Sequence, residues 1–170
     1  LRNAEKPLII SGGGVFYSGA VSELVSFAET FNIPVVETIA GRSAMLHDHP
    51  LNAGPLGVIG SSSANMLAEE ADVVVAVGTR LQDFTTGSWS VFGNEQMRLI
   101  AINAARYDAN KHRALSVVGD ALAGIEELGQ DLGGWKAPDP WISKSRSLYA
   151  EWNTTVEHHS GPTTDVPPSS

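Results

Sequence analysis

The sequence predicts a three-layer α/β domain built on a parallel β-sheet. Residues 73–77 form an apolar run with four valines and no polar alternation. Such a run is typical of a central parallel strand that is buried on both faces. Similar short runs alternate along the chain with segments whose apolar residues recur at helical spacing. The first strand–helix–strand unit is complete between Pro7 and Thr38, and crossovers of this kind are almost always right-handed.

The expected strands are short, apolar and bounded by glycine or polar residues. In chain order they are 7–10, 35–36, 56–59, 73–77, 98–102 and 115–118. The third of these depends on Leu56-Gly57-Val58-Ile59 close to Gly54, and is the least regular of the six.

The expected helices are marked by capping residues. Ser18, one of the serines 61–63, and Asp120 are the predicted N-caps, because a short side-chain oxygen can accept a free backbone N–H there. Asn32 is expected to end the first helix, since the following Pro34 forbids its continuation. A last helix, at about 139–159, carries a stripe that we interpret as packing surface against the sheet or a neighbouring domain. That stripe consists of Trp141, Ser145, Leu148, Trp152 and Val156.

Composition limits the classes of partner. The chain has 170 residues, which fits one domain, and a net charge of −8 from 11 Lys+Arg and 19 Asp+Glu. No basic run is present, so neither nucleic acid nor an anionic membrane is expected as a partner. The apolar runs are of strand length, no signal peptide is visible, and there is no cysteine. These features fit a cytoplasmic protein.

The ends of the chain resemble linkers, so we expect an excised domain. Residues 1–160 would form a single central α/β domain, with a core at about 4–132 and the trailing helix after it. The Pro- and Ser-containing residues 161–170 would be a linker towards a missing C-terminal domain.

Gly12, Gly13 and Gly14 follow the first strand and form a candidate phosphate loop, because glycines let backbone amides approach a phosphate. The dinucleotide fingerprint would need another glycine at position 17, where this chain has Tyr17. Glu37 ends the second strand and could act as the acid that binds the ribose. The alternative is a tight turn with no ligand.

Arg80 follows the strand 73–77 and is placed to bind an anion. The alternative is an ion pair with Asp83. If the first and fourth strands are neighbours, as at the switch point of a doubly wound sheet, the loops 12–14 and 78–87 flank one crevice. Ligands bind outside the carboxyl ends of such strands.

Two further sequence patterns are weaker functional signals than the two loops. His47-Asp48-His49 could be a metal pair, but no third ligand can be named, and a turn before Pro50 explains it better. No serine lies in a Gly-x-Ser-x-Gly motif with a defined histidine partner. The residues alone therefore predict an α/β domain with a candidate nucleotide crevice.

A series of segments in the expected order resembles the central domain of thiamine-diphosphate-dependent enzymes. The segments are 6–15, 18–20, 33–38, 48–60 and 71–81, within a matching region of about 4–132. Acetolactate synthases, pyruvate oxidases and oxalyl-CoA decarboxylases share this domain. The resemblance implies a Rossmann-like, six-stranded parallel sheet in the order 3-2-1-4-5-6.

Two segments, 78–92 and 107–115, are similar to the inositol-catabolism branch of these enzymes, the trihydroxycyclohexane-1,2-dione hydrolases. Such enzymes use thiamine diphosphate and Mg to cleave a carbon–carbon bond of a cyclic diketone. The resemblance implies that the coenzyme-binding residues lie in missing N- and C-terminal domains, that no residue here is catalytic, that this fragment alone is inactive, and that the full-length protein is a homo-oligomer.

The central domain of related enzymes binds FAD or ADP with the glycine loop and the loop arginine. The resemblance carries this role to Gly12, Gly13, Gly14 and Arg80, with Asn103 where an acid usually meets the ribose. The alternative function is therefore a nucleotide- or flavin-binding central domain of an acetolactate synthase-like or 2-oxo-acid decarboxylase enzyme.

Overall fold

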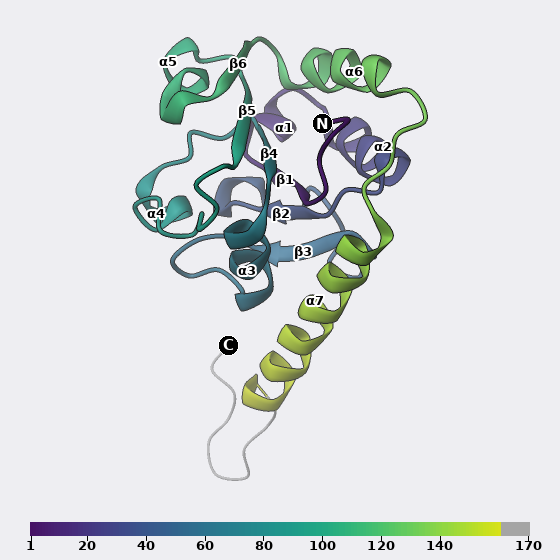
Figure 1. The fold of residues 1–170 in the computed structure, drawn as a ribbon. Helices are drawn as coiled ribbons and strands as arrows, with labels where there is room; N and C mark the ends of the chain where they lie inside the picture. The colour runs from purple at the N-terminus through teal and green to yellow at the C-terminus, as the bar shows by residue number, and fades with distance from the viewer. Residues whose placement is uncertain (161–170) are drawn as a thin grey trace.

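A computed structural model describes residues 1–160, so the predicted linker at 161–170 lies outside the described residues. The chain forms a six-stranded sheet in which every strand pairs in parallel with its neighbour (Figure 1). The order is β3-β2-β1-β4-β5-β6, which confirms the predicted fold class and topology. The strands are β1 (Pro7–Ser11), β2 (Val35–Glu37), β3 (Asn52–Pro55), β4 (Val73–Val77), β5 (Arg98–Asn103) and β6 (Leu115–Val118).

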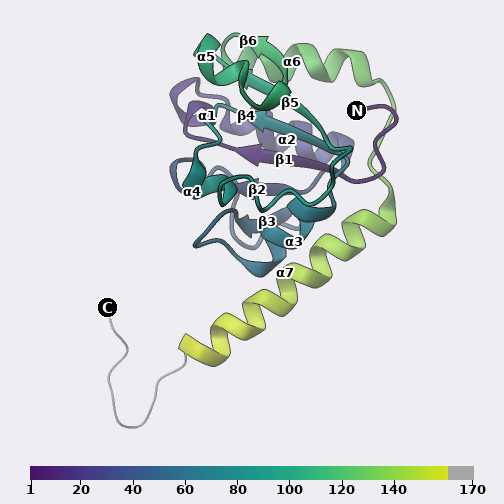
Figure 2. The same ribbon diagram turned by 60° about the vertical axis from the view of Figure 1, so that its left-hand side comes forward.

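Helices cover both faces of this sheet and make the three layers (Figures 1 and 2). The long helices α2 (Val21–Phe31) and α6 (Ala121–Leu132) pack together, and α3 (Ser62–Glu70) packs with α7 (Asp139–Ser160). The remaining helical segments are short and lie in the connections: α1 (Gly14–Tyr17), α4 (Asp83–Thr86), α5 (Arg106–Ala109), η1 (Ile39–Gly41) and η2 (Lys111–Arg113). No helix within residues 1–160 has both the length and the hydropathy needed to span a membrane.

The core is centred on β1 and β4, the two middle strands of the sheet. Ile9 pairs with Val75 across these strands, and both side chains are buried. Each such side chain contributes roughly 1.5–3 kcal/mol when it leaves water. The prediction that residues 73–77 form a strand buried on both faces is confirmed, with only Val73 partly exposed.

The predicted third strand at 56–59 is wrong, because the strand lies one segment earlier, at Asn52–Pro55. β3 has no β-branched run, and side-chain hydrogen bonds supplement its backbone pairing with β2. Asn52 Oδ1 accepts the Gly54 N–H at 2.8 Å, and Ser63 Oγ donates to the Ala53 carbonyl at 2.8 Å. Leu56 is still buried, and its N–H donates to the Glu37 carbonyl at 2.9 Å. The chain then leaves the sheet, and Val58 and Ile59 are exposed.

One of the predicted helix caps is also wrong. The segment expected to be one helix from Ser18 is divided into α1 and α2, and Ser18 is the C-cap of α1. Its hydroxyl oxygen accepts the Ala121 N–H at the start of α6, at 3.3 Å. The other predictions are confirmed, because Ser61 and Asp120 cap α3 and α6, and Asn32 ends α2 in the left-handed conformation.

The last helix is anchored at its N-terminal end and extends past the body of the domain at its other end (Figures 1 and 2). Trp141 Nε1 donates to the Pro7 carbonyl at 2.8 Å, and Lys6 and Lys144 both bind the Glu70 carboxylate. The predicted stripe is therefore packing surface over the first turns, against α3 and β3.

Candidate functional site

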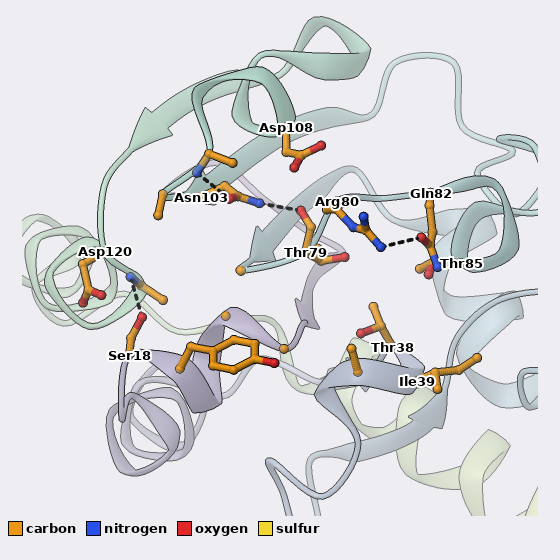
Figure 3. Close-up of a pocket in the computed structure, with 18 residues that line it drawn as sticks. Ser18, Thr38, Ile39, Thr79, Arg80, Gln82, Thr85, Asn103, Asp108 and Asp120 are labelled. Atoms are coloured by element: carbon orange, nitrogen blue, oxygen red, sulfur yellow. Dashed lines mark hydrogen bonds between the residues drawn. The ribbon is translucent and has the colours of Figure 1, made fainter.

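The principal cavity lies at the carboxyl edge of the sheet and has a volume of about 690 Å³ (Figure 3). The connections after β1, β2, β4, β5 and β6 all contribute to its lining. This is the crevice predicted from the switch point, because β1 and β4 are neighbours and the loops that follow them face each other.

The glycine loop touches the loop after β4 directly. A Cβ atom added to Gly14 would lie 2.6 Å from the Gly78 Cα, and one added to Gly12 would lie 2.4 Å from the Gly78 carbonyl oxygen. No side chain fits in so short a distance, so glycine is needed here for packing. The close approach explains these glycines without any ligand.

Most backbone amides of the glycine loop are already bonded. The Gly12 N–H donates to the Val77 carbonyl at 2.8 Å, and the Gly14 N–H donates to the Gly78 carbonyl at 2.9 Å. The next amides, of Val15 and Phe16, donate to carbonyls within the loop. Among residues 12–16, the Gly13 N–H is the one without an acceptor in the described part of the chain. A diphosphate would therefore meet one free amide here rather than a cradle.

Arg80 lies at the cavity and is exposed. Its Nη2 donates to Gln82 Oε1 at 3.0 Å (Figure 3). The alternative pairing with Asp83 is not observed within residues 1–160, because none of the ion pairs found there involves Arg80. Arg80 thus has no carboxylate partner within residues 1–160 and stays a candidate anion-binding group at the cavity wall.

Asn103 joins the loops after β4 and β5. Its Nδ2 donates to the Thr79 carbonyl at 2.9 Å, and its Oδ1 accepts the Ala105 N–H at 2.9 Å (Figure 3). Both polar atoms of the side chain are engaged with backbone. Asn103 therefore shapes the cavity wall, and a ribose would have to compete with these bonds.

Glu37 does not line the cavity, so its predicted role as the ribose-binding acid is wrong. The carboxylate is buried and turned towards the loop before β3, where it accepts the Met45 N–H at 3.0 Å. Burial raises the pKa of Glu37, while the backbone amides of residues 43–45 and the charge of Arg42 act in the opposite direction. Glu37 thus fixes the loop that follows β2.

Two carboxylates also line the cavity, Asp108 and Asp120, although the sequence did not predict either as a site residue. Asp108 binds Lys111 at 2.6 Å, and Asp120 Oδ1 accepts the Leu122 N–H at 2.9 Å. The hydrogen bond from Ser18 lowers the pKa of Asp120. Both residues follow a strand end, which is the same signal that pointed to Arg80.

The side chain of His49 is engaged with neighbouring protein groups through both of its ring nitrogens. His49 Nε2 contacts Glu29 Oε1 at 3.1 Å, and its Nδ1 accepts the Leu51 N–H at 3.2 Å. Within residues 1–160 no group of three His, Cys, Asp or Glu side chains could hold a metal ion. His47 and Asp48 lie in a turn that is closed by the His49 N–H, which donates to the Leu46 carbonyl at 3.0 Å.

A comparison with protein families identifies the family of this chain. The model of the family described as "Thiamine pyrophosphate enzyme, central domain" matches residues 1–128. The chain belongs to this family.

Several relatives share the name 3D-(3,5/4)-trihydroxycyclohexane-1,2-dione hydrolase. A Clostridium perfringens protein of that name is 51% identical over 128 residues, covering 75% of this chain and 20% of the relative. A Geobacillus thermodenitrificans protein is 42% identical over 158 residues, covering 92% of this chain and 24% of the relative. A Bacillus cereus protein is 48% identical over 132 residues, covering 75% and 20%. The chain thus spans about a fifth to a quarter of the curated relatives it matches.

The residues described here do not fit thiamine diphosphate itself. Diphosphate bound through a divalent cation needs oxygen ligands gathered around that cation. Within residues 1–160, no three His, Cys, Asp or Glu side chains come together to hold such a cation, and the glycine loop offers one free amide.

Proposed function

We propose that this chain is the central, non-catalytic domain of a thiamine-diphosphate-dependent hydrolase that cleaves a carbon–carbon bond of a cyclic 1,2-diketone in myo-inositol catabolism. The supporting observation is the shared name of relatives that are 42–51% identical over 75–92% of this chain. Those relatives are four to five times as long as the matched region. The other parts of such a protein would hold the coenzyme and Mg, and when bound the coenzyme supplies the nucleophilic ylid and the electron sink.

The proposed role of this domain is based on the hydrogen bonds that its cavity residues make. Gly12, Gly14 and Asn103 all bond to backbone carbonyls of residues 77–79, which supports a role for these residues in holding the carboxyl edge together. We further infer that the full-length protein is a cytoplasmic homo-oligomer, as the family resemblance and the absence of cysteine suggest. Light scattering of the full-length protein after gel filtration tests the oligomer, and cell fractionation tests the location.

The decisive experiment is turnover by the full-length protein. Trihydroxycyclohexane-1,2-dione should be consumed in the presence of thiamine diphosphate and Mg, and pyruvate should not. Turnover of pyruvate in its place would favour the alternative, a synthase or decarboxylase that acts on 2-oxo acids.

A second titration tests whether this domain holds the coenzyme. The 170-residue chain mixed with thiamine diphosphate and Mg should give no heat of binding in isothermal titration calorimetry. Saturable binding would contradict the assignment of a non-catalytic domain.

The crevice keeps an alternative role as a nucleotide or flavin site, formed by Gly12, Gly13, Gly14, Arg80 and Asn103. A cavity of about 690 Å³ with a charged arginine is large enough for a nucleotide. Because most polar atoms there are already bonded, we expect neither flavin absorbance in the purified protein nor a thermal shift with ADP. A saturable shift that Arg80→Gln abolishes would assign the nucleotide role.

A further inference from the structure

A second cavity, of about 420 Å³, lies at the amino edge of the sheet, where β4, β5 and β6 begin. It shares no lining residue with the crevice at the carboxyl edge. Figure 2 shows the N-terminus at this end of the sheet. The volume is within the range of cavities that hold a small organic molecule. We call it the amino-edge cavity, and its lining includes Val73, Met97, Arg98, Ile100, Arg113 and Leu115.

The floor of the amino-edge cavity is apolar and belongs to one face of the sheet. Val73 of β4 pairs with Arg98 of β5. Two residues further along β5, Ile100 pairs with Leu115 of β6. Because side chains alternate along a strand, all four point to the same face. Val73 and Ile100 are partly buried and Leu115 is 68% exposed, so water reaches this apolar floor.

Two guanidinium groups lie at this cavity, those of Arg98 and Arg113, and both side chains are exposed. None of the ion pairs within residues 1–160 involves either of them. The arginine side chains that donate hydrogen bonds there are Arg2, Arg80 and Arg146. The chain carries a net charge of −8, so carboxylates are plentiful, yet none in the described residues pairs with these two cations.

The backbone that carries Arg113 is strained. His112 and Arg113 are consecutive residues with φ +57 and +58, a conformation that is unfavourable for a side chain with a Cβ. Such strain persists only where the surrounding structure fixes it. The Trp89 ring stacks on His112 with centroids 4.0 Å apart. The Ala114 N–H closes the turn by donating to the Lys111 carbonyl at 3.0 Å. Arg113 is therefore held by a fixed turn, and strain of this kind is typical of binding sites.

We propose that the amino-edge cavity binds a small amphipathic carboxylate, an organic acid with an apolar body. A carboxylate accepts paired hydrogen bonds from the planar fork of a guanidinium. The apolar body would cover Val73, Ile100 and Leu115 and remove their exposed surface from water. Two cations above an apolar floor favour such an acid over a neutral alcohol and over a fully polar acid. The proposal concerns this chain's own residues and does not depend on the proposed function.

Isothermal titration calorimetry of the full-length protein with octanoate tests the chemical class of the ligand. Octanoate should bind saturably. Octanol lacks the charge and acetate lacks the alkyl chain, so each should bind at least about tenfold more weakly. An absence of saturable octanoate binding overturns the proposal, and so does equal affinity for octanol or for acetate.

The role of the guanidinium groups is tested by substitution in the full-length protein. Arg113→Gln should raise the Kd for octanoate about tenfold, since a hydrogen bond to a charged group is lost. Arg106→Gln is the matched control and should leave the Kd unchanged, because Arg106 is an exposed arginine of the same β5–β6 connection and lines neither cavity. Equal Kd values for the two variants overturn the proposal. If Arg113→Gln does not fold, Arg98→Gln replaces it.

A change in the floor tests the location. Leu115→Asp places a carboxylate beside the two guanidinium groups, so it should compete with the ligand and abolish octanoate binding. Val118→Asp is the control, because Val118 belongs to the same strand, is 48% exposed and does not line the cavity. Octanoate binding that survives in Leu115→Asp, or that is lost equally in both variants, overturns the proposal.

Discussion

Substituting Gly78 by alanine should be one of the most damaging single-methyl changes in this domain. Gly78 has φ +60 at the end of β4, a conformation that side chains rarely adopt. An added Cβ would also lie 2.5 Å from the Gly14 Cα, where two backbone segments meet. Neither the strand ends nor the loops can separate easily, since the Gly14 N–H donates to the Gly78 carbonyl.

The expected loss of unfolding free energy in Gly78→Ala has two parts, backbone strain and steric overlap. A left-handed conformation costs an alanine roughly 1–2 kcal/mol. Forcing a methyl group into a packed contact costs roughly 1–3 kcal/mol more. The Gly78→Ala variant should therefore lose about 2–5 kcal/mol of unfolding free energy, a large fraction of the ~5–15 kcal/mol typical of a domain.

Two matched variants isolate the parts. Gly19 has φ +65 but no atom within 4 Å of an added Cβ, so Gly19→Ala measures conformational strain alone, roughly 1–2 kcal/mol. Gly14→Ala meets the Gly78 Cα at 2.6 Å without a positive φ, and so measures the contact alone. Urea unfolding followed by circular dichroism gives the three values. If Gly78→Ala costs no more than Gly19→Ala, the close packing of the two loops is refuted.

Three further changes test other parts of the fold. Val75→Asp places an unpaired carboxylate in the centre of the sheet, which costs several kcal/mol, so the cooperative thermal transition should disappear; a sharp transition would reject the central position of β4. Because burial raises the pKa of Glu37, its deprotonation favours the unfolded chain, and this part of the stability is lost as pH rises from about 4.5 through the raised value. Glu37→Gln removes that slope, so urea midpoints of the two proteins should diverge between pH 4.5 and 7, and a constant gap would contradict the buried carboxyl. Trp141→Phe leaves the Pro7 carbonyl without its donor and should cost roughly 1–3 kcal/mol in urea unfolding, with Trp152→Phe, which has no such bond in the described structure, as the smaller control.

The parallel sheet was predictable because its central strands can be recognised from their apolar amino-acid composition alone. Buried parallel strands are apolar on both faces, and residues 73–77 show this with no knowledge of the rest of the fold. Short helices were not predictable in the same way. α1 and α4 have four residues each, which is too few for a helical period to appear, and their positions follow from the tight loops around Gly14 and Gly87.

The place of the crevice was predictable, but the state of its side chains was not. Residues after strand ends are brought to one edge by topology alone, and Arg80, Asn103 and Asp108 are all found there. Whether a polar atom is free depends on what lies opposite it. Asn103 is bonded to Thr79, 24 positions earlier, and no local pattern shows such a contact.

The misplaced third strand and the exposure of Val58 and Ile59 have the same physical origin. The apolar residues at 56–59 predict a strand only on the assumption that all of them are buried in the core of this domain. The sheet takes 52–55 instead, because Asn52, Ser61 and Ser63 satisfy its backbone through side chains, and Val58 and Ile59 are left in water.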